Sequence, residues 1–300
     1  MEILEYGDLS LKDELLPLMY QAFWWPFDPV EFEDTIRKDE RLHGPVGFCA
    51  LEGGKLAGFV GVMDIPTRTV DGQEVVGGIW GVATNPQFAH QGVSKTLIGR
   101  AHEYFKAMGY PFSFLHTSHT LIAYELYRKL GYSEVENYNQ FSSCYKLTRD
   151  CSPMKSMGEL DQVRIGKIYD KKMDGATGFV IRQRDLLEML TSRKKIDVKK
   201  SIQADNGYAL ISEKGGVVMV REIIAQDKKG VEELLAEVEK VAGKAIIDEL
   251  VTDQMVRRVY ESHGYFIQDV GYNVLMVWEI EGKFDRAYGD AFSISELDSF

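Results

Sequence analysis

The amino-acid sequence predicts an α/β (α+β) protein with two similar halves, each a mixed, mostly antiparallel sheet flanked by helices. Each half contains two apolar runs joined by a short turn with two adjacent glycines, at residues 52–55 and 213–216. Such a spacing is a strong hairpin signal. Each half also carries a helix that ends on Y-x-x-x-G-Y, at Tyr127–Tyr132 and Tyr260–Tyr265. The second half therefore reads as a degenerate copy of the first.

The elements of the first half follow from hydrophobic spacing and from turn residues. Apolar residues three and four apart predict helices, and short apolar runs between turn signals predict strands. Glycine and proline at 109 and 111 end the helix before them. The predicted strands are 2–7, 48–51, 56–63, 73–84, 112–116 and 142–147, the last closing the first sheet, and the predicted helices are 11–23, 31–41, 92–108 and 121–129.

A composition shift divides the chain. The polar and charged stretch 149–170 contains Pro153, which is the last proline of the sequence. Proline and polar residues commonly mark connections. We expect a first domain over 1–148, a linker over 149–170 and a second domain over 171–300, whose residues from Gly282 onward form a tail.

Bulk properties exclude several classes of function. The 300 residues are 45% hydrophobic and 27% charged, with a net charge of −11, and a surface this acidic argues against a nucleic-acid partner. No run of about 20 apolar residues is present, so we expect no membrane partner. The acidic start of the chain, without a signal peptide, and three cysteines outside any C-x-x-C motif (Cys49, Cys144 and Cys151) favour a cytoplasmic protein with reduced thiols.

The stretch from Thr84 to Leu97 carries the chemistry. An apolar strand ends at Pro86, Gly92 stands where the loop turns into a helix, and Ser94 and Lys95 follow in its first turn. Unpaired backbone N–H groups and the helix dipole make such a helix start an anion site. The spacing is neither that of a nucleotide P-loop nor G-x-G-x-x-G. We read the stretch as a diphosphate cradle.

Two motifs resemble the GCN5-related N-acetyltransferase superfamily. The loop Ala89–Ser94 follows the family's [RQ]-x-x-G-x-[GA] pattern around Gly92, with Ala89 and Ser94 as departures. The segment Ala123–Tyr132 follows A-x-x-L-Y-x-K-x-G-[FY] at the expected distance. The resemblance implies two acetyltransferase-like domains, of which only the first is catalytic.

The resemblance implies acetyl-CoA as co-substrate. Thr120 stands where the family often has an asparagine and is at best a weak contact. In the second half, Asp227 lies where phosphate would sit, so we expect no CoA there. The expected cofactor-binding residues are Val82, Ala83, Thr84, Ala89, His90, Gln91, Gly92, Val93, Ser94, Lys95 and Thr120.

Tyr127 matches the family's general-acid tyrosine, which protonates the departing sulfur. Its base is less clear, because Gly77 and Gly78 stand where some members place a glutamate. Glu74 is our first candidate, with Asp64 and His116 as others, and a water chain is an alternative. Tandem members that resemble this chain use a C-terminal carboxylate, which makes Phe300 a further candidate. We expect no metal, since His116 and His119 lack a third ligand.

The aromatic connection that contains Trp24, Trp25 and Phe27 is either a plug of the core or a wall of the acceptor pocket. We assign these three residues and His116 to acceptor binding. The sequence thus predicts acetyl transfer from acetyl-CoA to a primary amine of a small molecule or peptide, with a homodimer left open. The alternative is a non-catalytic tandem protein that senses an acyl-CoA or a small ligand.

Overall fold

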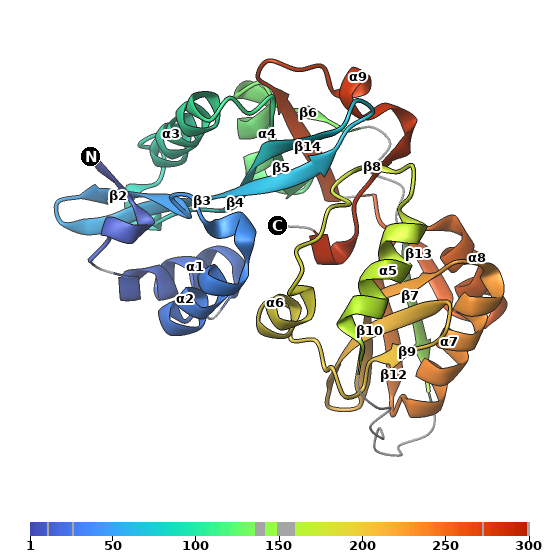
Figure 1. Cartoon of the computed structure of the whole chain (residues 1–300). Coiled ribbons are helices and arrows are strands. Elements are labelled where there is room, and N and C mark those ends of the chain that lie inside the picture. Colours follow the sequence, from blue (N-terminus) through green and yellow to red (C-terminus); the bar gives the residue numbers. More distant parts are fainter. Residues whose placement is uncertain (11, 26, 136–141, 149–159, 272, 299–300) are drawn as a thin grey trace.

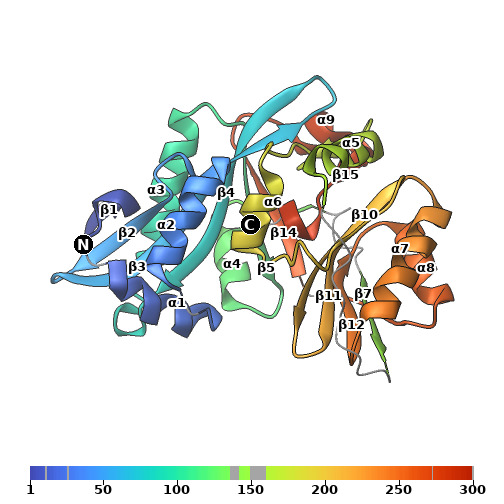
Figure 2. The ribbon, with the colours of Figure 1, turned by 60° about the horizontal axis from the view of Figure 1, so that its bottom comes forward.

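We analysed a computed structural model of the whole chain, which describes all residues except 11, 26, 136–141, 149–159, 272 and 299–300. Two sheets, each with its own helices, lie side by side, and the described end of the chain lies between them (Figures 1 and 2). The predicted fold class is confirmed. Within the described residues, no helix combines the length and the apolar character needed to cross a membrane.

The first sheet runs in the order β1-β2-β3-β4-β5-β14-β6, and a small parallel pair, β8 and β15, is attached to β3. Its strands up to β4 form antiparallel neighbours, as the hairpin signals predicted. The strands are β1 (Glu2–Glu5), β2 (Gly47–Glu52), β3 (Lys55–Arg68), β4 (Gln73–Thr84), β5 (Phe112–Ser118), β6 (Ser133–Glu134), β8 (Thr177–Gly178), β14 (Asn273–Glu279) and β15 (Phe292–Ser293).

Helices cover both faces of this sheet. Strand β3 alternates its side chains, so that Phe59 and Met63 join one apolar cluster while Val60 and Val62 join another. The first cluster includes the buried face of α1 and Phe32 of α2, and the second includes the apolar face of α3. The helices are α1 (Leu15–Phe23), α2 (Pro29–Lys38), η3 (Glu40–Leu42), α3 (Val93–Ala107) and α4 (Ile122–Lys129).

The second sheet runs in the order β13-β7-β12-β11-β10-β9. Its strands are β7 (Ser142–Leu147), β9 (Ile202–Gln203), β10 (Gly207–Lys214), β11 (Val217–Ala225), β12 (Ala245–Val251) and β13 (Phe266–Asp269). The helices of this part of the chain are α5 (Gln162–Lys172), α6 (Leu186–Arg193), α7 (Lys228–Val241), α8 (Gln254–Ser262), α9 (Phe284–Tyr288) and the last turn η7 (Glu296–Asp298).

The two halves exchange a strand. β7 pairs with β12 and β13 in the second sheet, whereas β14 lies between β5 and β6 in the first. The expectation that residues 142–147 close the first sheet is therefore wrong. The physical reason is burial: Val274 to Val277 are at most 3% exposed, and this apolar run fills the position between β5 and β6 better than the polar β7, whose Tyr145 and Leu147 face solvent.

The expected linker and tail also contain ordered structure. Helix α5 begins at Gln162, inside the predicted linker, while residues 149–159 lie outside the described residues. In the predicted tail, Tyr288 is fully buried and its ring lies 5.5 Å from that of Phe112. The tail therefore packs on the first sheet. The division of the chain into two domains at 149–170 stays a prediction.

Candidate active site

The first sheet opens between β4 and β5. These parallel strands pair only from Gly77 to Ile79, opposite Ser113 to Leu115. Beyond that point β4 continues to Thr84 along β3, while β5 continues to Ser118 along β14. The carboxyl ends of two parallel strands thus diverge, which is where open α/β sheets bind ligands.

A bulge in β4 lies beside this opening. The register shifts so that Gly81 and Val82 are both placed between the pairs Gly61–Trp80 and Phe59–Ala83. Gly81 has φ of 59°, a conformation that glycine adopts without steric cost. A bulge re-aims neighbouring groups. Here it lies next to Trp80, whose indole N–H donates to the carbonyl of Val62 at 3.2 Å.

The start of α3 is open to an anion. Gly92 is its N-cap, with φ of 79° and no side-chain cap, and a Cβ at this position would meet no atom within 4 Å. The hydroxyl groups of Thr84 and Ser94 lie 2.6 Å apart and join the strand end to the helix. Because no side chain caps the first amides of α3, the residues present fit a diphosphate.

The loop residues of the sequence prediction gather around this helix start. Ala89, His90, Gln91 and Lys95 are exposed, whereas Val93 is buried and anchors α3 to the sheet. In the adjoining strand, Val82 and Thr84 are half-buried and Ala83 is buried, so Ala83 can offer only its main chain. Thr120 bonds to Ser118 at the end of β5, on the other side of the opening.

A cavity of about 410 Å³ adjoins the opening. Its aromatic wall consists of Phe23, Trp25, Phe32 and Trp80, with the rings of Phe32 and Trp80 5.4 Å apart. His116 of β5 also lines it, and burial, with a smaller effect of Lys194, lowers the pKa of His116 to about 4. The imidazole is therefore neutral at pH 7.

The aromatic connection is partly wall and partly core. Trp25 lines the cavity, as expected. Phe27 is 1% exposed and supports Trp25 from behind, with the two rings 5.2 Å apart. Trp24 is 78% exposed at the end of α1 and does not line the cavity. Of the four predicted acceptor residues, the structure places Trp25 and His116 in the cavity wall.

Charged residues of the cavity come from both parts of the chain. Asp28 and Glu31 lie in the first half, whereas Arg193 is the last residue of α6 in the second half and Lys195 follows it. Glu31 pairs with Lys195 at 3.4 Å. Sequence reasoning missed Phe32, Trp80 and both cations. Of these residues, Trp80 could have been found from the sequence, because it directly follows the part of β4 that pairs with β5.

Tyr127 is 5% exposed in α4 and belongs to the apolar cluster that contains Val93 of α3 and Leu115 of β5. Burial raises its pKa, so its phenol keeps its proton at neutral pH. Its ring lies 6.1 Å from that of Tyr132, the last residue of its motif. Tyr127 is thus buried in one apolar cluster with α3, which begins at the anion loop, and β5, which borders the opening on its other side.

The structure does not bring Glu74 to this site. Glu74 accepts a hydrogen bond from Tyr288 at 3.1 Å and lies six positions before Trp80, which is about 20 Å along an extended strand. Asp64 lies opposite Gly77 and accepts hydrogen bonds from Tyr104 of α3, so its side chain is on the face of the sheet opposite to that of Met63, which lines the cavity. Phe300 lies outside the described residues. His119 pairs with Glu134, away from His116.

The fold and the loop together define an α/β protein with an anion site at a helix start and a cavity in an opened sheet. Residues 16–132 match the family model of the acetyltransferase (GNAT) family, which places a domain of this family in the first half of the chain. Among curated proteins no match was found.

Solved structures share the fold over nearly the whole chain. A GCN5-related N-acetyltransferase from Kribbella flavida is 17% identical, with a TM-score of 0.68 over 93% of this chain and 71% of its own. One from Anabaena variabilis is 14% identical, with a TM-score of 0.62 over 92% and 72%. Eis1 from Mycobacterium abscessus is 14% identical, with a TM-score of 0.58 over 94% and 74%. At these identities the likeness concerns the fold alone.

Proposed function

We propose that this protein is an acetyl-CoA-dependent N-acyltransferase that acetylates a primary amine of a small molecule or peptide. The observation that carries the proposal is the uncapped start of α3 at Gly92, in the loop and helix that follow β4, the strand that diverges from β5. An anion bound there would place an attached acyl chain along the opening between β4 and β5. The family match supports acyl transfer as the reaction class.

In this proposal each part of the site has one task. The amides that follow Gly92 hold the diphosphate, and the strand end from Val82 to Thr84 offers main-chain groups to the pantetheine arm. The neutral amine attacks the thioester carbonyl, so that a C–N bond forms and the C–S bond breaks. Tyr127, which burial keeps protonated, gives its proton to the departing sulfur.

The proton of the amine needs an acceptor. His116 lies in the cavity wall, but a pKa of about 4 makes its imidazole a weak base at pH 7. We retain the Phe300 carboxylate and a water chain as the other candidates. We leave out Glu74 because of its distance from the opening, and Asp64 because it bonds to Tyr104 of α3 on the other face of the sheet.

The cavity favours an amine with an apolar part. Trp25, Phe32 and Trp80 can pack on a ring or an aliphatic chain, and a cavity of about 410 Å³ suits a small molecule or one side chain of a peptide. The net charge of −11 would attract a cationic acceptor and repel nucleic acid. We further propose a cytoplasmic location, which the few cysteines outside any C-x-x-C motif support.

Binding and turnover test the proposal separately. Isothermal titration should show acetyl-CoA binding at micromolar affinity or tighter, about 8 kcal/mol. A panel of primary amines, read by release of free thiol, should then give turnover. Tyr127→Phe should lower kcat by about 100-fold or more while acetyl-CoA affinity stays the same, because it removes only the proton donor. Tyr124→Phe, on the same helix, is the matched control and should keep full activity.

The second candidate function is a non-catalytic sensor of an acyl-CoA. The departures at Ala89 and Ser94 from the family pattern, and the absence of a carboxylate near the opening among the described residues of β4, favour it. A sensor would bind acetyl-CoA yet release no thiol with any amine, and Tyr127→Phe would change nothing measurable. Absence of acetyl-CoA binding by folded protein would contradict both functions.

A further inference from the structure

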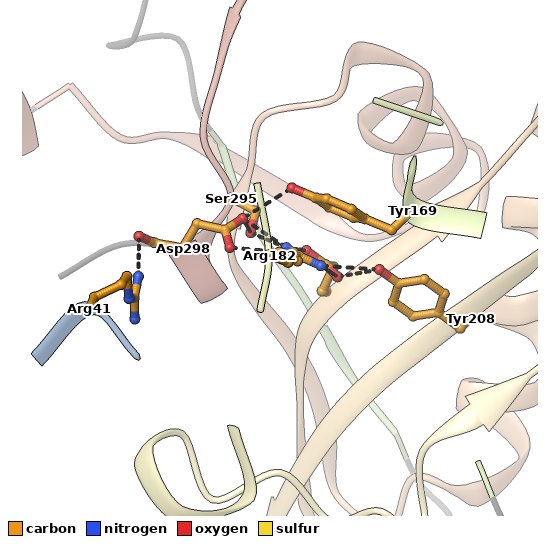
Figure 3. Close-up of polar contacts among 7 residues, drawn as sticks. Arg41, Tyr169, Arg182, Tyr208, Ser295 and Asp298 are labelled. Carbon is orange, nitrogen blue, oxygen red and sulfur yellow. Dashed lines mark hydrogen bonds and ion pairs between the residues drawn. The ribbon is translucent and has the colours of Figure 1, made fainter. Parts of the chain in front are cut away.

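A cluster of buried charged residues joins the two halves (Figure 3). Its centre is Arg182, whose side chain is 6% exposed. The guanidinium donates to both carboxylate oxygens of Glu222, at 2.8 and 2.5 Å, and to both of Asp298, at 3.0 and 2.8 Å. Glu222 belongs to β11 and Asp298 to the last turn η7, so one side chain holds the described end of the chain to the second sheet.

Three neutral side chains, those of Tyr169, Tyr208 and Ser295, complete the surroundings of the guanidinium. Together with Arg182, Glu222 and Asp298 they form what we call the Arg182 cluster. The guanidinium lies 3.6 Å from the ring centre of Tyr169, and it also donates to the hydroxyl groups of Tyr208 and Ser295, at 3.2 and 2.9 Å. Burial alone would lower the pKa of Arg182, but Asp298 and Glu222 raise it well above its usual value. The arginine is therefore charged at every pH at which the protein folds.

The cluster continues into the wall of the acceptor cavity. The main-chain carbonyl of Asp298 accepts a hydrogen bond from Arg41 of η3 at 3.3 Å. Arg41 in turn makes two bonds of 2.8 Å to Asp39, and Asp39 also pairs with Arg193 at 3.2 Å. Arg193 lines the cavity. A continuous series of polar contacts thus leads from Arg182 to the cavity.

A gain in the free energy of folding does not explain why these buried ion pairs are present. Buried ion pairs cost so much desolvation energy that apolar residues of similar size often give an equally stable protein. What they do provide is a fixed geometry, because an unpaired buried charge is strongly disfavoured. Here the contacts fix η7, η3 and α6 relative to one another, and these elements come from segments far apart in the sequence.

We propose that Arg182 is a positioning residue for the acceptor cavity. By holding η7 in place, Arg182 keeps η3 and Arg193, which lines the cavity, in their positions. Arg182 itself lines neither the cavity nor the anion loop. The effect on catalysis rests on the proposed function, whereas the effect on structure does not.

Hydrogen exchange measured by mass spectrometry tests the structural part without any ligand. Arg182→Met should speed exchange of the amides at 39–42 and 186–195 by about tenfold, while α3 stays protected. Asp298→Asn, a milder change that keeps the shape, should act in the same direction, and Arg182→Lys should restore part of the protection. Tyr260→Phe is the control, because it removes a buried bond of 2.8 Å to Asp248 elsewhere in the second half. Unchanged exchange at 186–195 in both Arg182→Met and Asp298→Asn would overturn the proposal.

Kinetics with tryptamine, an amine that matches the aromatic wall, test the catalytic part. Arg182→Met should raise KM for tryptamine about tenfold and leave acetyl-CoA affinity unchanged, and Tyr260→Phe should change neither. Faster exchange with an unchanged KM would overturn the role in positioning the cavity. If the wild type releases no thiol with tryptamine or with the amine panel, the proposed function fails, and the exchange result alone decides the role of Arg182.

Discussion

Helices α3 and α7 occupy corresponding places in the two halves but begin differently. Each follows a strand and leads into a parallel neighbour of that strand, β4 to β5 and β11 to β12. At α3 the N-cap is Gly92, without a side-chain cap. At α7 it is Asp227, whose carboxylate accepts from the amide of Gly230 at 2.8 Å. The helix start is thus open to an anion in the first half, whereas a carboxylate occupies the corresponding helix start in the second half.

The cavities beside these helices show a parallel difference. In the second half the parallel pairing ends at Val220 and Asp248, and Arg221 is the extra residue of a bulge, as Gly81 and Val82 are in the first. A cavity of about 370 Å³ lies there too. Its wall carries charged residues instead of tryptophans: Lys172, Arg221, Glu222, Asp248 and Asp253. The second half has kept the backbone geometry and changed both the helix cap and the wall.

The largest expected effect comes from giving α3 the cap of α7. Gly92→Asp should weaken acetyl-CoA binding at least 100-fold, about 3 kcal/mol, because a carboxylate would take the first amides of the helix and repel the diphosphate. Gly92→Asn is the matched control: asparagine tolerates the left-handed backbone but adds no charge, so the loss should be severalfold only. Titration calorimetry measures both. Equal losses would mean that shape, not charge, distinguishes the two helix starts.

The exchanged strand β14 should be sensitive to acid. His102 of α3 stacks on Trp278 of β14 at 3.9 Å and bonds to Tyr132, and burial, helped by Lys106, lowers its pKa from 6.5 to about 4. The unfolded chain therefore takes up this proton first. This contribution to the free energy of unfolding is complete above pH 6.5. It falls by about 3 kcal/mol as the pH drops to 4, with little further loss below.

Urea unfolding at several pH values measures this contribution. His102→Gln keeps a hydrogen-bonding side chain but does not titrate, so its unfolding midpoint should fall less between pH 6.5 and 4 than that of the wild type. The absolute stability of the variant is not the test, since the stacking on Trp278 is lost at every pH. If the unfolding midpoints of the two proteins fall equally between pH 6.5 and 4, the contact between α3 and β14 does not respond to acid.

The aromatic wall should matter for the acceptor and not for acetyl-CoA. Trp25→Ala should raise KM for an aromatic amine about tenfold, or roughly 1.4 kcal/mol, because it removes one face of the cavity. Trp24→Ala is a control one position away, on a side chain that is 78% exposed and outside the cavity. Steady-state kinetics with tryptamine compare the two. An equal effect of both changes would place the acceptor outside the cavity.

Local signals were enough to predict the fold class and the anion loop. The turns at 52–55 and 213–216 form the expected hairpins, because glycine turns fix strand pairing over a few residues. Gly92 begins α3 as expected. Both features depend on neighbours in the sequence, so their physical causes can be read from a short stretch.

Features that depend on distant segments could not be predicted. The exchange of β7 and β14 is decided by which strand is buried between β5 and β6 of the first sheet, and that competition involves residues about 130 positions apart. Arg193 reaches the cavity only through the packing of α6 beside α2. Glu74 seemed close to the site because it precedes the loop, but an extended strand separates it from the opening.

The smallest expected effect comes from removing the cap of α7. Asp227→Ala should lower the free energy of unfolding by about 1 kcal/mol, whereas Asp227→Asn, which still accepts a hydrogen bond, should be nearly neutral. Urea unfolding measures both. In titration calorimetry Asp227→Ala should still bind one acetyl-CoA per chain, because Asp248 and Asp253 remain in the wall of the second cavity and oppose an anionic ligand. A stoichiometry of two would show that one carboxylate at a helix start is all that separates the two halves.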